Sequence, residues 1–248
     1  MKALTQPLHE LAEFEEARVS LKRKKTPLYI SGCVDTQKCH VINGLGEGYR
    51  YKVIITYSEI KARELYDDMK LYKVPVFYYP SKDIIFYSAD VHGRAIVQER
   101  MNVIRNILEQ KEAVIITTLD CGMEHCVPLN SYQHSIMEFV IDEDIDTDNL
   151  RNELYTLGYE YAAQVNMPGE FAIRGGIVDI FPLTEEVPYR IELWGDTISS
   201  IHSFDVESQR SIEEVHDFSL YSATECMADE DRIARGLARI GKEIKAND

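Results

Sequence analysis

With 248 residues, of which 45% are hydrophobic, the chain is long enough for one large domain or two smaller ones, and too apolar to be disordered. It has no run of about 18 apolar residues and no apolar signal segment at its N-terminus, so the sequence predicts a cytoplasmic protein and argues against a membrane-spanning or secreted one. A formal charge of −15 disfavours direct binding of duplex DNA, because contacts to phosphates rely on lysine and arginine.

Apolar strands and helices alternate through the first half of the chain. Strands are predicted at residues 28–31, 52–57, 74–80 and 113–118. Helices are predicted at residues 5–25, 58–72 and 94–110, and a weak helix follows Lys38 and ends at the glycines of residues 44–48. This alternation indicates an α/β fold, a parallel sheet with helices on both faces.

The pattern changes near Pro128. A strand is predicted at 135–141, followed by a helix that Thr147 caps and Gly158 ends. Short strands with tight turns then follow at residues 159–165, 169–175, 176–181, 189–195 and 197–204. We therefore predict an α/β domain at 1–127, a smaller antiparallel α+β domain at 128–222, and the helical start of a following segment of a longer protein at 223–248.

The five cysteines follow no regular spacing. Cys121 and Cys126, with His125 between them, come closest to forming a cluster, and a zinc site would need a second close pair. The sequence therefore predicts free thiols in a reducing compartment, with no bound metal and no disulfide framework.

The stretch SGCVDTQKC, directly after the first predicted strand, has the outline of a phosphate-binding loop. Gly32 and Lys38 occupy the positions of the first glycine and the lysine in the pattern G-x-x-x-x-G-K-[ST]. Gln37 replaces the second glycine, Cys39 replaces the hydroxyl that would bind Mg²⁺, and Asp35 adds a negative charge where phosphate would bind. The sequence thus predicts a degenerate loop with no ATP hydrolysis and no cofactor. Residual nucleotide binding through Gly32 and Lys38 stays open as an alternative.

The most specific motifs lie between Pro168 and Val215. They are G-E-F-x-x-R-G-G-I-x-D-I-F-P, R-I-E-x-x-G-D-x-I-x-S-I and F-D-x-x-S-Q-R-S. Together with a looser similarity over residues 78–121, they resemble the UvrB-homology region at the N-terminus of bacterial transcription-repair coupling factor (Mfd). The resemblance covers roughly residues 5–225, and the F-D-x-x-S-Q-R-S motif favours the coupling factor over UvrB itself.

This resemblance implies a module derived from the UvrB helicase fold, so that the α/β domain would be helicase-like with a phosphate loop that no longer works. It implies a non-catalytic fragment that docks UvrA through the second domain and recruits nucleotide excision repair to stalled RNA polymerase. The parent protein would be an ATP-dependent DNA translocase. Its motor, and the parts that contact DNA and RNA polymerase, would lie outside this chain.

The resemblance also names the residues expected to bind the partner. Arg174 matches the arginine of the family's R-G pair, with Glu170 and Phe171 on the same segment, although strand alternation puts Phe171 on the opposite face. Tyr161 stands near a position where relatives often carry arginine, and Ala172 replaces an arginine of UvrB-like proteins.

Two alternatives stay open for this surface. Arg174 could instead form a salt bridge inside the domain, for instance with Asp179 or Glu192. The module could also act as an autoinhibitory clamp that contacts the motor half of the same protein.

Overall fold

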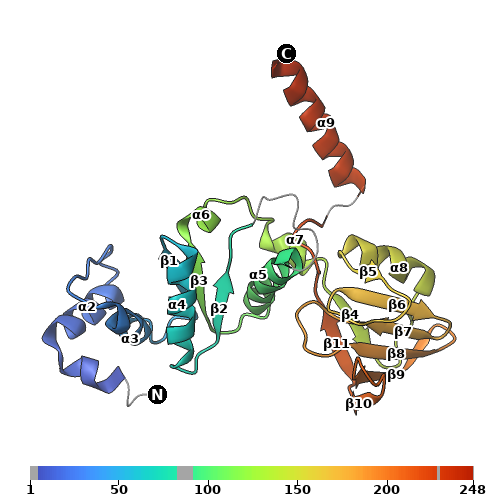
Figure 1. The fold of residues 1–248 in the computed structure, drawn as a ribbon, viewed down its shortest axis with the longest axis horizontal. Helices are drawn as coiled ribbons and strands as arrows, with labels where there is room; N and C mark the ends of the chain where they lie inside the picture. Colours follow the sequence, from blue (N-terminus) through green and yellow to red (C-terminus); the bar gives the residue numbers. More distant parts are fainter. Residues whose placement is uncertain (1–4, 83–91, 228–229, 248) are drawn as a thin grey trace. The chain divides into compact units, whose positions relative to one another are not determined.

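The computed structural model of the chain describes residues 5–82, 92–227 and 230–247 (Figure 1). The chain divides into two compact units, Met1–Glu124 and His125–Asp248. Within the described residues, no helix has the length and apolar character needed to cross a membrane. Within the stretch 223–248, predicted to be helical, the structure has the helix α9 (Glu230–Asn247).

The first unit is built on a three-stranded parallel sheet of order β1-β3-β2. Its strands and flanking helices are β1 (Tyr51–Thr56), β2 (Val76–Tyr79), β3 (Ala113–Thr118), α4 (Glu59–Lys70) and α5 (His92–Leu108). The central strand β3 is buried along its whole length. Its residues Val114 and Ile116 pack with side chains of α4, and Ala113 and Ile115 pack with side chains of α5. A parallel sheet with helices on both faces is therefore confirmed (Figure 1).

The long helix predicted at 5–25 is interrupted at Leu11. The elements in this region are η1 (Gln6–Glu10), α2 (Ala12–Lys22) and, after the loop, α3 (Asp35–Leu45). Leu8 and Phe14 both pack against Gly44 of α3, where an added Cβ would lie 2.9 Å from each of them. On one continuous helix these two side chains would point about 120° apart, so the break at Leu11 is what allows both to reach the same small residue.

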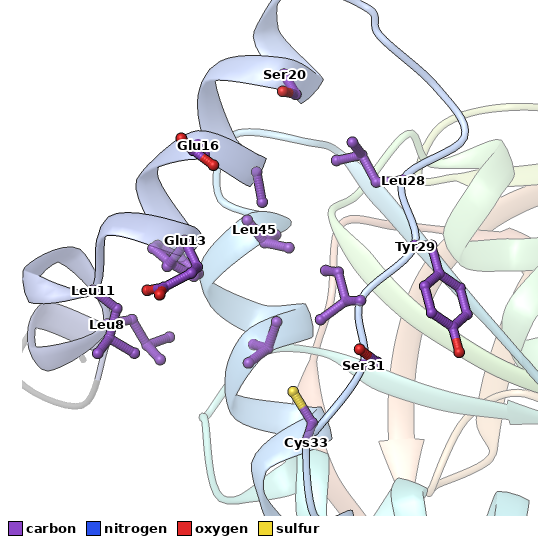
Figure 2. Close-up of a pocket in the computed structure, with 14 residues that line it drawn as sticks. Leu8, Leu11, Glu13, Glu16, Ser20, Leu28, Tyr29, Ser31, Cys33 and Leu45 are labelled. Atoms are coloured by element: carbon purple, nitrogen blue, oxygen red, sulfur yellow. The ribbon is translucent and has the colours of Figure 1, made fainter.

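The strand predicted at 28–31 is wrong. These residues pair with no strand in the part of the chain that the structure describes. Figure 2 shows Leu28 directed toward a hollow beside α2 and α3, whereas Tyr29 points away and is 93% exposed. Leu28 is the only residue of the run that is half-buried, beside two helices rather than in a sheet, and Ile30 is 47% exposed. The helix expected after Lys38 also begins earlier than predicted, at Asp35.

The second unit contains a six-stranded sheet of order β10-β9-β8-β7-β6-β5. Its strands are β5 (Glu160–Tyr161), β6 (Glu170–Arg174), β7 (Ile177–Ile180), β8 (Tyr189–Trp194), β9 (Thr197–Phe204) and β10 (Ser211–Glu214). Neighbouring strands are antiparallel except β5 and β6, which are parallel. The mainly antiparallel sheet is confirmed, but the strand expected at 159–165 is only two residues long, and β10 is absent from the predicted strands.

One face of this sheet, which we call the core face, is covered by a helix and a separate pair of strands. The covering elements are α8 (Thr147–Thr156), β4 (Met137–Val140) and β11 (Asp217–Leu220), in which β4 and β11 are antiparallel. Phe171 of β6 meets Tyr155 of α8 with ring centroids 5.4 Å apart. Tyr189 of β8 stacks on Phe218 of β11 at 4.4 Å. Aromatic contacts therefore join the sheet to both of its covers.

The ends of α8 follow from local chemistry. The side chain of Asp146 accepts hydrogen bonds from the backbone amides two and three residues later, at 3.1 and 3.2 Å, so Asp146 caps the helix and the prediction of Thr147 is wrong. A carboxylate at this position also meets the positive end of the helix dipole. Gly158 ends the helix with a φ of 86°, and an added Cβ there would lie 2.6 Å from the side chain of Thr224.

Candidate functional site

The four residues of the predicted phosphate loop do not converge on one point. Gly32 has a φ of 85° and lies in the loop before α3. Gln37 accepts a hydrogen bond from the backbone amide of Val34 at 3.2 Å, so its side chain serves the start of its own helix. Cys39 is 1% exposed within the core of the first unit, and burial raises the pKa of its thiol to about 11. Lys38 alone points a charged group outward.

Lys38 is itself neutralised by its own loop. Its Nζ donates to Oδ1 of Asp35 at 2.7 Å, and Lys61 of α4 donates to Oδ2 of Asp35 at 3.0 Å. The hydrogen bonds from Lys38 and then Lys61 lower the pKa of Asp35 to about 2. Asp35 therefore stays ionised and engages the ammonium groups of both Lys38, the lysine of the loop pattern, and Lys61. The degenerate loop stays a prediction, and these contacts are consistent with it.

A hollow of about 480 Å³ lies beside α2, α3 and the segment that connects them (Figure 2). Its lining is mainly apolar, with Leu8, Leu28 and Leu45 among the contributors and with Glu13 and Glu16 on α2. These residues include no nucleophile paired with a base. Among the residues that the structure describes, no group of three His, Cys, Asp or Glu side chains could hold a metal ion.

The second candidate site lies on the six-stranded sheet, on the face opposite the core face. Side chains alternate between the two faces along each strand. The register pairs Ala172 of β6 with Asp179 of β7, and Asp179 with Arg190 of β8, so side chains from three strands share this side. We call it the arginine face and define it by Arg174, Ile177, Asp179, Arg190, Glu192 and Trp194.

A buried carboxylate organises the arginine face. Asp179 is fully buried and accepts hydrogen bonds from Nε of Arg190 at 2.7 Å and from Nη2 of Arg190 at 3.0 Å. Arg174 donates to the same carboxylate through its Nη2. The hydrogen bonds that Arg190 donates to Asp179 raise the pKa of Arg190, whose guanidinium also lies 4.5 Å from the ring centroid of Phe204. Two permanent positive charges are thus held by one buried negative charge.

Arg174 and Arg190 differ in what they expose. The Arg190 side chain is 17% exposed, whereas that of Arg174 is 44% exposed. Within the described chain, Arg174 uses only its Nη2, so its Nε and Nη1 have no partner there. The internal salt bridge considered for Arg174 therefore exists, and it leaves half of the guanidinium available to another molecule.

The other residues predicted to bind the partner lie on β6 or on the neighbouring β5, and each has a different structural role. Phe171 is fully buried on the core face, as strand alternation predicts, so it supports the sheet and is not exposed to a partner. Tyr161 of β5 is 46% exposed and contacts the ring of Phe171 at 5.7 Å. Glu170 accepts hydrogen bonds from the backbone amides of Asn166 and Met167 at 2.8 and 3.2 Å, and so holds the preceding loop.

Sequence reasoning missed Ile177 and Trp194 of the arginine face, and it also missed Arg190. Its position inside the R-I-E motif suggests nothing about charge pairing, because the pair depends on the register between β7 and β8. Ala172, which replaces an arginine of UvrB-like proteins, is fully buried in a small cluster with Val165, Phe181 and Phe204. Compared with UvrB-like proteins, the arginine face therefore lacks one positive charge, at a position where Ala172 packs with apolar side chains.

Comparison with known proteins supports the motif-based resemblance. Residues 137–226 match the family described as the UvrB interaction domain, a range that contains the whole arginine face. The chain is 31% identical over 196 residues to the transcription-repair-coupling factor of Bacillus subtilis (strain 168), which covers 78% of this chain and 17% of that protein. It is 34% identical over 189 residues to the transcription-repair-coupling factor of Staphylococcus aureus (strain USA300), covering 73% of this chain and 16% of that protein.

These matches confirm the resemblance predicted from the motifs. The aligned regions, 17% and 16% of the relatives, amount to about one sixth of their length.

Proposed function

From the UvrB interaction domain at residues 137–226, we propose that this chain is a non-catalytic module of a transcription-repair coupling factor that docks UvrA. In this role it recruits nucleotide excision repair to stalled RNA polymerase in the bacterial cytoplasm. The parent protein is an ATP-dependent DNA translocase, and its motor and its contacts to DNA and RNA polymerase belong to other segments. Lys38 and Lys61 both donate to Asp35, which supports a first unit that is not catalytic.

The observation that carries the proposal is the half-exposed Arg174 on a rigid sheet. Asp179 holds the guanidinium through Nη2 alone, and the Arg174 side chain is 44% exposed. Arginine forms paired, charge-assisted hydrogen bonds with carboxylates, and a side chain that is already oriented loses little entropy when a partner binds. The surface therefore suits a protein that presents a carboxylate to Arg174.

The proposal is tested by size-exclusion chromatography of this chain mixed with UvrA from the same organism. We expect the two to elute together, and we expect added UvrB to displace this chain because both would use the same site on UvrA. Separate elution at high micromolar concentrations would contradict UvrA docking. Co-elution that UvrB does not affect would keep UvrA as the partner and place the contact on a different surface of UvrA.

A further inference from the structure

The chain has a single tryptophan, Trp194, and it is 86% exposed at the end of β8. Isolated exposed apolar residues are common and need no explanation. Trp194 differs because other exposed residues suited to binding surround it on the arginine face. Along β8 it lies on the same side as Arg190 and Glu192, because the buried Ile191 and the half-buried Leu193 point to the core face.

The register brings Trp194 near Arg174. The backbone amide of Leu193 donates to the carbonyl of Gly176 at 2.7 Å, so Trp194 lies beside the glycine turn that joins β6 to β7. Arg174 and Ile177 flank this turn and pair directly with each other across it. Ile177 is 37% exposed. A tryptophan, an isoleucine and a half-exposed arginine therefore gather at one end of the arginine face.

The backbone of β8 is paired on both sides as far as Glu192, and Trp194 itself pairs with Thr197 of β9. Tyr189–Trp194 pairs with β9 along its length, and residues Tyr189–Glu192 pair with β7. The register shift between β8 and β9 leaves Ser199 as the extra residue on β9, so the alternation of side chains along β8 is kept. A rigid aromatic side chain on a paired strand adds contact area at low entropic cost.

We propose that Trp194 is the anchor of the docking surface, inserting its indole into an apolar pocket of the partner while Arg174 binds a neighbouring carboxylate. The inference rests on the proposed function and specifies the chemistry of UvrA that this chain recognises. Tryptophan and arginine are the residue types that most often dominate binding energy at protein interfaces. The apolar and charged contacts lie together, so one partner surface can satisfy both.

The single tryptophan makes the test direct. Replacing it with 5-hydroxytryptophan gives a fluorophore that can be excited selectively in the presence of UvrA. We expect acrylamide quenching of this fluorophore to fall several-fold when UvrA is added. We also expect Trp194→Ala to weaken UvrA binding by at least about 10-fold. Ile212→Ala, which alters an exposed apolar residue on β10 at the far edge of the sheet, serves as the matched control and should bind normally.

The outcomes separate this inference from the proposed function. If the chain binds UvrA but quenching is unchanged and Trp194→Ala binds normally, the inference is overturned and UvrA docking stands. If the unaltered chain does not bind UvrA, both fail. Thermal unfolding of Trp194→Ala, followed by circular dichroism, should match that of the unaltered chain because the indole is almost fully exposed.

Discussion

Arg174 and Asp179 form an ion pair across two adjacent strands, and the same buried carboxylate holds Arg190 from the next strand. Sequence reasoning treats an internal salt bridge and partner binding as alternatives for Arg174. The structure shows the internal pair, and the 44% exposure of the Arg174 side chain makes the two roles compatible. Asp179 can therefore be regarded as the residue that orients Arg174.

Replacing Asp179 tests how far the arginine face depends on its buried charge. Asp179→Asn should lower the free energy of unfolding of the second unit by about 3 kcal/mol, because two arginines lose a buried counter-charge. Chemical denaturation followed by far-ultraviolet circular dichroism measures the change. Asp196→Asn, in the exposed β8–β9 turn, is the control and should stay within about 0.5 kcal/mol of the unaltered chain. Equal stability of the two variants would contradict a central role for Asp179.

Tyr78 offers a test in the first unit. Its hydroxyl is buried without a hydrogen-bond partner in the described part of the chain, and burial raises its pKa to about 12. Tyr78→Phe removes this hydroxyl and keeps the ring, over which the Arg63 guanidinium lies at 4.1 Å. We expect the protein to become more stable by about 1 kcal/mol.

Tyr79→Phe is the matched control for that variant. The Tyr79 hydroxyl accepts a hydrogen bond from the buried Arg100 at 2.8 Å. Its loss should destabilise the protein by about 1 to 2 kcal/mol. Similar destabilisation by both substitutions, measured by chemical denaturation, would mean that the Tyr78 hydroxyl has a partner after all.

The lysine pair around Asp35 predicts a specific pH response. The pKa of Asp35 is lowered from 3.8 to about 2, so this contribution to stability is present above the higher value and is lost as the pH falls toward the lower one. Lys61→Met should raise the pKa of Asp35, as measured by an NMR titration of its carboxyl carbon. Lys70→Met, which removes an exposed partner of Asp67, should leave it unchanged. The same pKa of Asp35 in the two variants would contradict the contact between Lys61 and Asp35.

The chain should not bind ATP. Lys38 is engaged by Asp35, the Cys39 thiol is buried, and Gln37 bonds to the start of its own helix. Adding ATP and Mg²⁺ should therefore leave the midpoint of thermal unfolding unchanged. A rise in the midpoint that disappears in Lys38→Ala would contradict this account and restore the nucleotide-binding alternative.

Much of the fold was predictable from two regular patterns, the alternation of strands with helices along the chain and the alternation of side chains between the two faces of a strand. The apolar run that became β3 is buried on both faces, as expected for the centre of a parallel sheet, and the opposite orientations of Phe171 and Arg174 follow from a period of two. By contrast, the apolar run at 28–31 looked like a strand, but it pairs with no described strand, and its one half-buried residue, Leu28, lies beside α2 and α3.

The missed strands and the missed arginine have a common cause. β10 is exposed along its whole length and carries no apolar alternation, and β11 pairs with β4, which lies far away in the sequence. The contact of Arg190 with Asp179 depends on the register of two strands. Each of these features is determined by long-range pairing, which local sequence patterns do not specify.

The measurement that tests the central claim most directly is a calorimetric titration of UvrA with this chain and with Arg174 variants. Binding should be lost or strongly weakened in Arg174→Glu and weakened in Arg174→Gln. Both variants should remain folded by circular dichroism. Arg210→Glu makes the same charge change beside the far edge strand β10 and should bind normally. Equal affinities for the Arg174 and Arg210 variants, or no binding by the unaltered chain, would contradict UvrA docking through the arginine face.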